Sequence, residues 1–355
     1  MNKKIIFVCQ KVTYDGASKM LNWTVNKLAE IPGNNVSLYT FYYSKTNYCF
    51  DENVKWHQKI REKNERWKII FDLRSYLKRE KPDMVVSFLY DAGVYSLLAT
   101  IGLQIPVIVC ERTDPNANKL LNIKFAQAMY RMASGAVFQL PAAQQYFKNI
   151  IKKETCVIPN PVFDTGYTVS LPFEQRRDVI SYVGRISNFQ KRLDLLISAF
   201  SIYAQKNKTV KLELYGDGED MEAIKRQIEA LNMQERIVVK GSVSNPMQYV
   251  STSKCYILSS DFEGIPNSLL EAMSVGVPVI STDTSPGGAR FLISNNQNGL
   301  LVKCGDINML ADKMDYLFNN PQKADDMGKN AKQVLERFKE DNIAKMWDSY
   351  LNTFM

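Results

Sequence analysis

Histidine is nearly absent from this sequence, which holds a single one, His57, among 355 residues. Because His57 belongs to no recognisable motif, the sequence disfavours an enzyme built on a catalytic histidine or a histidine-rich metal centre. The six cysteines are scattered without metal-ligand spacing, and several lie in apolar segments. We therefore expect reduced core thiols rather than disulfides or metal ligands.

Long apolar runs are also missing. No stretch approaches the about 20 apolar residues that a membrane-spanning helix needs. The first residues, MNKKIIFVCQ, have the pattern of a strand rather than of a signal peptide. We therefore expect a cytoplasmic protein. Repeats and low-complexity tracts are absent as well, and 355 residues with 45% apolar content predict two globular domains.

Acidic residues are scarce in the first half of the chain. Residues 1–165 hold 23 Lys and Arg against 14 Asp and Glu, a net charge of +9, whereas residues 166–355 hold 22 against 23, a net charge of −1. The bases gather between Lys55 and Lys81, interleaved with aromatics such as Trp67 and Phe71. Such a stretch is typical of a protein that sits on anionic lipid at the inner face of a membrane.

The basic stretch has a second interpretation. Residues 67–79 fit a helix that packs Ile70, Leu73 and Leu77 on the core and keeps its bases in water. For residues 56–66 no clean period appears, and both interpretations stay open there. Nucleic acid is not expected as a partner, because no nucleic-acid motif accompanies the charge.

Apolar strands alternate with helical patterns along the whole chain, which predicts an α/β protein with doubly wound sheets. Strands of the first domain are predicted near residues 4–9, 36–41, 84–89, 107–111, 135–139 and 155–159. The predicted boundaries are 1–165 for the first domain, 166–178 for a proline-containing linker and 179–339 for the second domain.

The most informative segment reads DFEGIPNSLLEAM, residues 261–273. Glu263 and Glu271 stand eight positions apart around a Gly-Ile-Pro turn that opens an apolar helix, which Asn267 or Ser268 can cap. The start of such a helix attracts anions, phosphate above all. Carboxylates accept hydrogen bonds from the hydroxyls of a sugar or ribose. The alternative is a capped helix with two solvated acids.

Upstream, an apolar strand ends at Gly184 and Arg185, and a helix opens after Lys191 and Arg192. Basic side chains at the carboxyl end of a strand lie where open α/β sheets bind ligands. The alternative is that these bases are ordinary solvated charges.

Two further strands end in glycine. Gly216 and Gly218 lie in YGDG, and Gly241 opens GSVSNP. A glycine turn lets a ligand approach the backbone, although one such turn alone is weak support.

In order, VGR with Lys191, YGDG, KGSVSNP, EGIPNSLLEAMSVGVPVISTD and GGARFLISNNQNGLLV resemble the donor-binding half of the retaining glycosyltransferases of family 4, which have the GT-B fold. These motifs span about residues 181–302. Weaker matches in the first half are KKIIFVCQ with YDGAS, PDMVVSFL, ERTDP and VIPNPV. ERTDP and SPGGARFLI resemble the branch that builds bacterial capsule, O-antigen or other surface and lipid-linked glycans.

The resemblance implies two Rossmann-like doubly wound domains that face a cleft. The first, residues 1–165, would bind the acceptor, and the second, residues 179–339, would bind the donor. A C-terminal segment of about residues 340–355 would cross back onto the first domain.

The resemblance also implies roles for residues. Arg185 and Lys191 would stabilise the departing diphosphate, and Glu263 would contact the transferred sugar, which makes these three the catalytic candidates. Glu271 would bind the ribose. The full donor-binding set is Gly184, Gly216, Gly241, Val243, Gly264, Ile265, Pro266, Asn267, Ser268 and Glu271, with Gly241 and Val243 beside the base.

On the acceptor side, the candidates are Asp15 and Gly16 after the first strand and Glu111 and Asp114 in ERTDP. For Glu111 and Asp114, a structural salt bridge or turn fits the sequence equally well. The role of Arg290 in GGARFLI stays open.

The implied activity is transfer of a hexose or N-acetylhexosamine from a nucleotide-diphosphate sugar, UDP-linked by preference, to a hydroxyl of a glycan, with polyprenyl-diphosphate-linked glycans preferred as acceptors. No cofactor or metal is expected, since bases can neutralise the diphosphate and no DxD pair stands among the motifs. The alternatives are a nucleotide-sugar epimerase of the same fold and a noncatalytic scaffold subunit.

Overall fold

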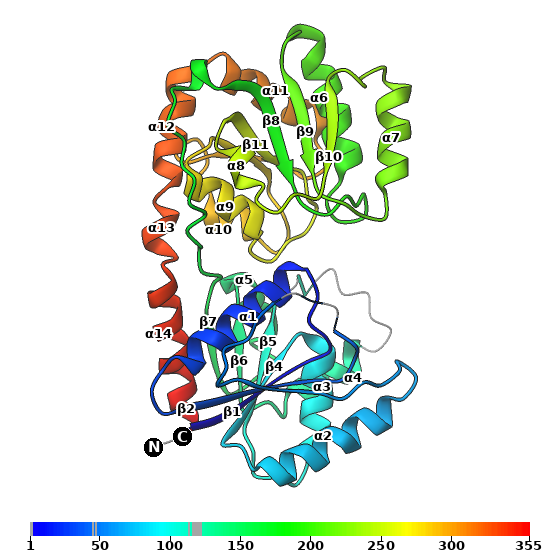
Figure 1. Cartoon of the computed structure of the whole chain (residues 1–355), viewed down its shortest axis with the longest axis vertical. Coiled ribbons are helices and arrows are strands. Elements are labelled where there is room, and N and C mark those ends of the chain that lie inside the picture. The colour runs from blue at the N-terminus through cyan, green and yellow to red at the C-terminus, as the bar shows by residue number, and fades with distance from the viewer. Residues whose placement is uncertain (1–2, 45, 47, 113, 116–122) are drawn as a thin grey trace. The chain divides into compact units, whose positions relative to one another are not determined.

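The computed structural model describes residues 3–44, 46, 48–112, 114–115 and 123–355. The chain divides into two compact units. Unit 1 comprises Met1–Asn160 and Glu340–Met355, and unit 2 comprises Pro161–Lys339. Each unit contains one parallel sheet flanked by helices (Figure 1). The predicted α/β architecture with two Rossmann-like sheets is therefore confirmed.

Unit 1 has the strand order β3-β2-β1-β4-β5-β6-β7, with all neighbours parallel. The central strands are apolar and fully buried, as parallel strands covered on both faces must be. The strands are β1 Lys3–Cys9, β2 Asn34–Thr40, β3 Lys55–Gln58, β4 Met84–Phe88, β5 Val107–Glu111, β6 Gly135–Phe138 and β7 Glu154–Val157. The helices are α1 Gly16–Ala29, α2 Arg66–Glu80, α3 Tyr90–Ala99, α4 Ile123–Tyr130, α5 Pro141–Phe147 and α14 Glu340–Leu351.

The edge strand β3 has no counterpart among the predicted strands. It contains the single histidine, and His57 stacks on the rings of both Tyr39 and Tyr76 at centroid distances of 5.2 Å and 4.7 Å, while the two tyrosine rings lie 4.9 Å from each other. Burial lowers the pKa of His57. The side chain is therefore part of a small aromatic cluster.

The C-terminal segment returns to unit 1, as the resemblance implies. Trp347 of α14 is buried and stacks on Phe88. The Tyr350 hydroxyl donates to the carbonyl of Glu154 at 2.7 Å and accepts from the amide of Ala136 at 2.9 Å. These contacts close the sheet edge at β6 and β7.

Unit 2 has the strand order β10-β9-β8-β11-β12-β13, again all parallel. Its strands are β8 Arg177–Val183, β9 Lys211–Tyr215, β10 Ile237–Gly241, β11 Ser253–Leu258, β12 Val279–Thr282 and β13 Leu300–Val302. Its helices are α6 Leu193–Lys206, α7 Met221–Ala230, α8 Met247–Val250, α9 Asn267–Val275, α10 Gly288–Leu292, α11 Ile307–Phe318, α12 Pro321–Ala331 and α13 Val334–Arg337.

Residues 166–178, predicted to form a linker, instead pack on unit 2. The Val169 amide donates to the carbonyl of Val275 at 2.8 Å. Phe173 is 2% exposed and meets Phe318 edge-on. The Arg176 guanidinium pairs with Asp325 of α12. The segment, with its single proline Pro172, is therefore held by partners that are distant in sequence, and β8 begins at its end.

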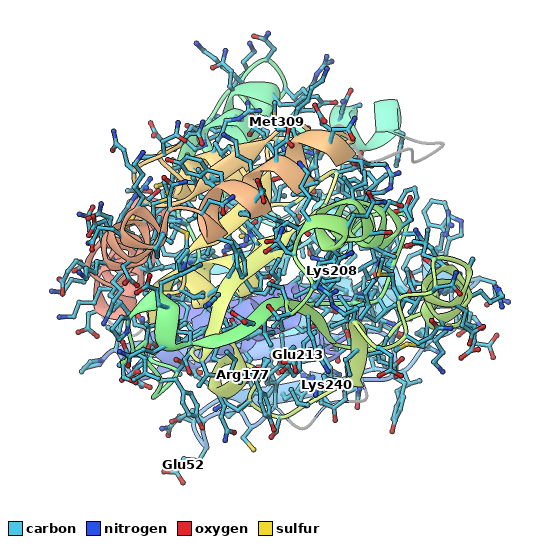
Figure 2. All side chains as sticks on the ribbon, turned by 90° about the horizontal axis from the view of Figure 1, so that it is seen from above. Glu52, Arg177, Lys208, Glu213, Lys240 and Met309 are labelled. Atoms are coloured by element: carbon cyan, nitrogen blue, oxygen red, sulfur yellow. The ribbon has the colours of Figure 1, made fainter. Side chains whose placement is uncertain are left out.

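A charged cluster spans β8, β9 and β10 of the second sheet (Figure 2). Glu213 of β9 is buried and pairs with Arg177 at 3.0 Å and Lys240 at 3.3 Å. The Tyr215 hydroxyl donates to the same carboxylate at 2.6 Å. A buried carboxylate needs such partners, so this cluster is accounted for by the sheet.

Candidate active site

The site begins where the strand order of unit 2 reverses. From β8 the chain runs outward through β9 and β10, then returns to β11 on the other side of β8. The loops after β8 and β11 therefore leave neighbouring strand ends, which is where open α/β sheets bind ligands. The Asp261 amide donates to the Gln190 carbonyl at 2.9 Å, and the Gln190 side chain donates to the Phe262 carbonyl at 3.1 Å. The two loops thus form one hydrogen-bonded unit.

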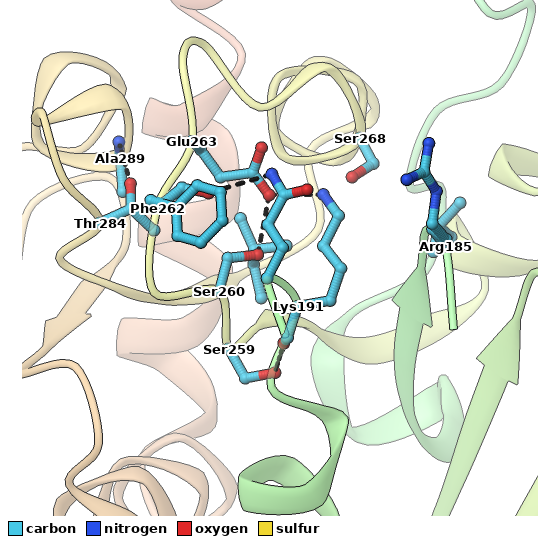
Figure 3. Close-up of polar contacts among 12 residues, drawn as sticks. Arg185, Lys191, Ser259, Ser260, Phe262, Glu263, Ser268, Thr284 and Ala289 are labelled. Atoms are coloured by element: carbon cyan, nitrogen blue, oxygen red, sulfur yellow. Dashed lines mark hydrogen bonds and ion pairs between the residues drawn. The ribbon is translucent and has the colours of Figure 1, made fainter. Parts of the chain in front are cut away.

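Lys191 and Glu263 form the charged centre of this unit (Figure 3). The Lys191 amino group pairs with Glu263 Oε1, which also accepts from the Ser260 hydroxyl at 2.8 Å. The Ser259 hydroxyl donates to the Lys191 carbonyl at 2.7 Å. Glu263 is 8% exposed, and a buried carboxylate needs such hydrogen-bonding partners. Two of the catalytic candidates are therefore in direct contact.

The N-cap of α9 lies earlier in the chain than the predicted cap, Asn267 or Ser268. The N-cap is Pro266, so Asn267 and Ser268 are the first helical residues and the predicted side-chain cap is wrong. Ser268 Oγ instead accepts from the Tyr256 hydroxyl at 2.8 Å, and that hydroxyl also lies 3.3 Å from the Val183 carbonyl. Tyr256 of β11 therefore links the first turn of α9 to β11 and, through Val183, to β8. The amides and the positive dipole end of the first turn still belong to the site.

Arg185 follows β8 directly, and the Tyr182 hydroxyl holds its carbonyl at 2.8 Å. Its side chain is exposed and enters no ion pair with the rest of the described residues. In Figure 3 the side chains of Lys191, Ser268 and Arg185 lie along the side of the site where α9 begins. Two cationic side chains therefore lie on the side of the site where α9 begins, an arrangement that suits an anion.

Arg192 has a different role from the solvated charge weighed above. It pairs with Asp194 at 3.0 Å and with Asp261 at 2.8 Å. These carboxylates raise the pKa of the guanidinium. Arg192 therefore ties the start of α6 to the loop that contains Glu263.

The two glycines after β9 are required by the backbone that follows β8. A Cβ on Gly216 would lie 1.8 Å from the Gly184 carbonyl oxygen, and one on Gly218 would lie 2.2 Å from the Ile186 carbonyl oxygen. The YGDG turn therefore lies against the backbone of the VGR segment. Gly241 has φ of +71° but open space around it, and Val243 lies beyond it in the loop after β10.

The glycine pair in SPGGARFLI supports the site from behind. A Cβ on Gly288 would lie 1.7 Å from the Gly264 carbonyl oxygen. The Glu263 amide donates to the Ser285 carbonyl at 2.8 Å. Arg290 pairs with Asp283 through two bonds of 2.6 Å and 2.7 Å.

The remaining donor-side candidates lie on α9 and just before it. Ile265 and Pro266 are buried before the helix, and Glu271 is partly exposed in its second turn. Three supporting residues were missed by sequence reasoning, namely Ser259, Ser260 and Gly288. A signal existed for the serines, since two polar residues directly follow the apolar strand β11.

The acceptor-side candidates in unit 1 make internal contacts. Asp15 is the N-cap of α1, where its carboxylate accepts from the Ser18 amide at 2.8 Å and from the Thr13 hydroxyl. Gly16 is the first residue of that helix. Glu111 is buried at the end of β5 and accepts from the Tyr130 hydroxyl. Burial raises the pKa of Glu111 to about 7.

The neighbours of Glu111 in ERTDP are buried as well. The Arg112 guanidinium lies over the rings of Phe88 and Trp347, and its Nη1 donates to Asn160 Oδ1 at 3.1 Å. Burial lowers the pKa of Arg112 to about 10. Asp114 is also buried. This segment therefore supports the carboxyl edge of the first sheet.

Two general observations bear on the chemistry. Among the described residues, no three His, Cys, Asp or Glu side chains come together as a metal ion would need. Within the same part of the chain, none of the helices has the length and apolarity that crossing a membrane requires.

The fold and the site define a glycosyltransferase of the GT-B type. Residues 167–334 match the family described as glycosyl transferases group 1. The chain thus carries a group 1 glycosyltransferase domain that includes every element of the site in unit 2, and it is an enzyme of this class.

The whole chain is similar to one relative with a specific name. It is 25% identical over 356 residues to the GalNAc-alpha-(1->4)-GalNAc-alpha-(1->3)-diNAcBac-PP-undecaprenol alpha-1,4-N-acetyl-D-galactosaminyltransferase of Campylobacter jejuni, covering 97% of each chain.

Solved structures agree on the fold. The lipopolysaccharide outer core galactosyltransferase WaaB in its apo form has a TM-score of 0.81 at 22% identity, over 99% of this chain and 100% of that one. The Anabaena protein HepE, solved with UDP and glucose, has a TM-score of 0.83 at 20% identity over 99% of each chain.

Proposed function

We propose that the enzyme is a retaining glycosyltransferase of family 4. It transfers a hexose or N-acetylhexosamine from a UDP-linked sugar to a sugar hydroxyl of a lipid-linked glycan, in the synthesis of a bacterial surface polysaccharide. The observation that carries the proposal is the Lys191–Glu263 pair beside Arg185 and the start of α9. The Campylobacter relative, named for an undecaprenol-linked acceptor, and HepE, solved with UDP and glucose, support it.

The cations and the helix start act on the leaving group. When the bond between the anomeric carbon and the diphosphate breaks, negative charge grows on the departing phosphate. Arg185, Lys191 and the first-turn amides of α9 stabilise this charge more than the charge of the ground state, which lowers the barrier. Lys191 is suited to this task because Glu263 and the Ser259 contact fix its position.

The two glutamates act on hydroxyls. Glu263 is held by Lys191 and Ser260, and its second oxygen can accept from a hydroxyl of the transferred sugar. Glu271, in the second turn of α9, accepts from the ribose hydroxyls. Gly241 and Val243 border the base.

The transfer step needs no strong base from the protein. The acceptor oxygen attacks the anomeric carbon from the face that the diphosphate leaves, so the anomeric configuration is retained. One carbon–oxygen bond breaks, one forms, and the acceptor proton moves to the departing phosphate oxygen. This course fits a chain whose single histidine lies in an aromatic cluster on β3.

The acceptor and the location complete the proposal. Unit 1 would bind the acceptor at the carboxyl edge of its sheet, near Asp15, Gly16, Glu111 and Asp114. A polyprenyl-diphosphate carrier places that glycan at the inner face of the cell membrane, so the enzyme would act in the cytoplasm beside the membrane.

Calorimetric titration tests the donor site. We expect UDP to bind and GDP and ADP to bind more weakly, with UDP affinity reduced at least about tenfold in Lys191→Ala and Glu271→Ala. Lys208→Ala removes an exposed lysine from unit 2 that is remote from these loops in sequence and should leave affinity unchanged (Figure 2). Absence of binding by all three nucleotides would overturn the proposal.

Incubation with a UDP-sugar alone tests the reaction type. A transferase releases UDP slowly by hydrolysis and leaves the remaining donor sugar unchanged. Appearance of a second sugar epimer in the nuclear magnetic resonance spectrum would instead assign an epimerase.

A further inference from the structure

The outer face of α2 presents two large apolar side chains to solvent. Trp67 is 72% exposed and Phe71 is 65% exposed, and their spacing of four residues places them one above the other on the helix. The inner face of the same helix buries Ile70, Leu73 and Leu77. The core alternative weighed for this helix is therefore right for its inner face, whereas the aromatics of the outer face lie mostly in solvent.

A neighbouring turn extends the apolar face. Arg74, one turn beyond Phe71 on the same side of α2, donates to the carbonyls of Ala99 at 2.8 Å and Ile101 at 2.6 Å. These bonds fix the turn after α3 beside α2. Ile101 is 50% exposed there, and Ile60, in the loop that leads into α2, is 59% exposed.

Positive charge surrounds these side chains. Lys55–Lys81 contains ten Lys and Arg against four Asp and Glu. Three of the four acids already have basic partners: Glu65 pairs with Lys68, Asp72 with Arg61, and Glu80 with Lys4 and Arg79. Lys59, Lys63 and Lys78 are exposed and join no ion pair among the described residues. The surplus charge is therefore available to a partner.

We propose that this face docks unit 1 on an anionic lipid bilayer. The docking face consists of Ile60, Trp67, Phe71 and Ile101 with Lys59, Lys63 and Lys78 at its rim. Aromatic rings favour the depth of the lipid headgroups, and lysines reach anionic headgroups on long apolar stems. The one-signed rim is complementary to a negative lipid surface.

The docking face rests on the proposed function in one respect, namely the lipid-linked acceptor. Because α2 follows β3, its first turn begins at the carboxyl edge of the first sheet. Gln10, Asp91 and Glu111 lie at that edge, at or just after the ends of β1, β4 and β5. Docking through Trp67 would bring the edge that faces the acceptor to the headgroups where the carrier diphosphate lies.

Cosedimentation of the full chain with vesicles tests the docking face. We expect binding to phosphatidylcholine vesicles that contain phosphatidylglycerol, weaker binding to pure phosphatidylcholine, and a loss in high salt. Trp67→Ser combined with Phe71→Ser should weaken binding at least about tenfold, as should Lys63→Glu combined with Lys78→Glu.

Matched variants in unit 2 serve as controls. Met309→Ser removes an exposed apolar side chain, and Lys206→Glu combined with Lys208→Glu changes the net charge as much as the lysine pair on α2 (Figure 2). Both should bind vesicles within about twofold of the wild type. If the Lys206 and Lys208 variant lost vesicle binding equally, binding would depend on overall charge alone, and the proposed docking face would be refuted.

Tryptophan fluorescence provides a second readout. Trp23 and Trp347 are buried and Trp56 is partly covered, so Trp67 is the exposed one of four tryptophans. We expect vesicles of brominated lipid to quench the emission of the wild type and to quench Trp67→Phe much less. Equal quenching of both proteins would overturn the placement of Trp67 in the bilayer.

The two proposals can fail separately. A chain that binds UDP but does not sediment with anionic vesicles would refute the docking face and leave the donor site intact. A chain that sediments through α2 but binds no nucleotide would refute the proposed function and leave the docking face intact.

Discussion

The two units have the same strand order around their first strand, β3-β2-β1-β4 in unit 1 and β10-β9-β8-β11 in unit 2, yet their carboxyl edges differ. In unit 2 the edge gathers Arg185, Lys191 and the start of α9. In unit 1 the acids at the carboxyl edge make internal contacts instead, since Asp15 caps α1 and Glu111 bonds to Tyr130. A shared scaffold therefore does not set the chemistry, which depends on the loops.

The largest expected effect comes from removing Lys191, the cation at the centre of the unit 2 site. We expect Lys191→Ala to lower the transfer rate at saturating donor by about 10²–10³-fold, the cost of losing one transition-state donor. Lys208→Ala should retain the wild-type rate. If Lys191→Ala raised only KM, the lysine would bind ground and transition states equally, and its catalytic role would be refuted.

A second test concerns the glycine contacts that support the site. Gly288→Ala should lower the free energy of unfolding of unit 2 by about 3 kcal/mol, because its Cβ would strike the Gly264 carbonyl. Gly241→Ala, with positive φ but open space, should cost about 1 kcal/mol. Since all four tryptophans lie in unit 1, far-ultraviolet circular dichroism in urea is the suitable probe. Equal losses would contradict the Gly264 contact.

A third test concerns the buried acid of unit 1. The pKa of Glu111 is raised to about 7 from 4.5. The folded state therefore binds the proton more tightly, and the contribution of Glu111 to the free energy of unfolding falls as pH rises from about 4.5 to 7. The charge of Asp91 adds to this preference, whereas the hydrogen bond from the Tyr130 hydroxyl opposes it.

Glu111→Gln should accordingly be more stable than the wild type by about 2 kcal/mol at pH 8 and nearly equal to it at pH 5. Urea unfolding followed by tryptophan emission measures this in unit 1. A variant that is less stable than the wild type at pH 8 would show that the carboxylate is ionised and needed in the folded protein.

The smallest expected effect separates capping from acceptor contact. Asp15→Ala should lower stability by about 1 kcal/mol, and Asp15→Asn should retain the cap and the stability. If Asp15 only caps α1, the asparagine variant keeps full transfer activity. Activity lost in both variants would instead place the carboxylate at the acceptor.

The fold could be predicted because buried parallel strands have a recognisable local sequence pattern. The strands β1, β4 and β5 are short apolar runs between turns, and each was predicted within a residue or two. The strand β3 was not, because KWHQ is a short edge strand with no apolar alternation. The polar, proline-containing segment 166–178 suggests a free linker, whereas the partner of Arg176 is Asp325, far along the chain.

The site could be predicted in part for the same reason. The segment 261–273 predicts a helix start between two acids. A strand that ends in Gly184 and Arg185 predicts a ligand-binding edge of the sheet. That Lys191 pairs with Glu263 and that Gly288 touches Gly264 are contacts between distant segments, for which no local pattern exists. For Asp15 the signal existed, since an acid before an apolar helix is an N-cap signature.

The return of α14 to unit 1 has a consequence for biosynthesis. Unit 2 is continuous in sequence, whereas unit 1 is assembled from residues on both sides of it. On the ribosome, residues 161–339 emerge before α14 does. Unit 2 can therefore close while the first sheet still lacks the tyrosine that bridges β6 and β7 and the tryptophan that covers Phe88. Unit 1 would therefore mature last, after unit 2 is already complete.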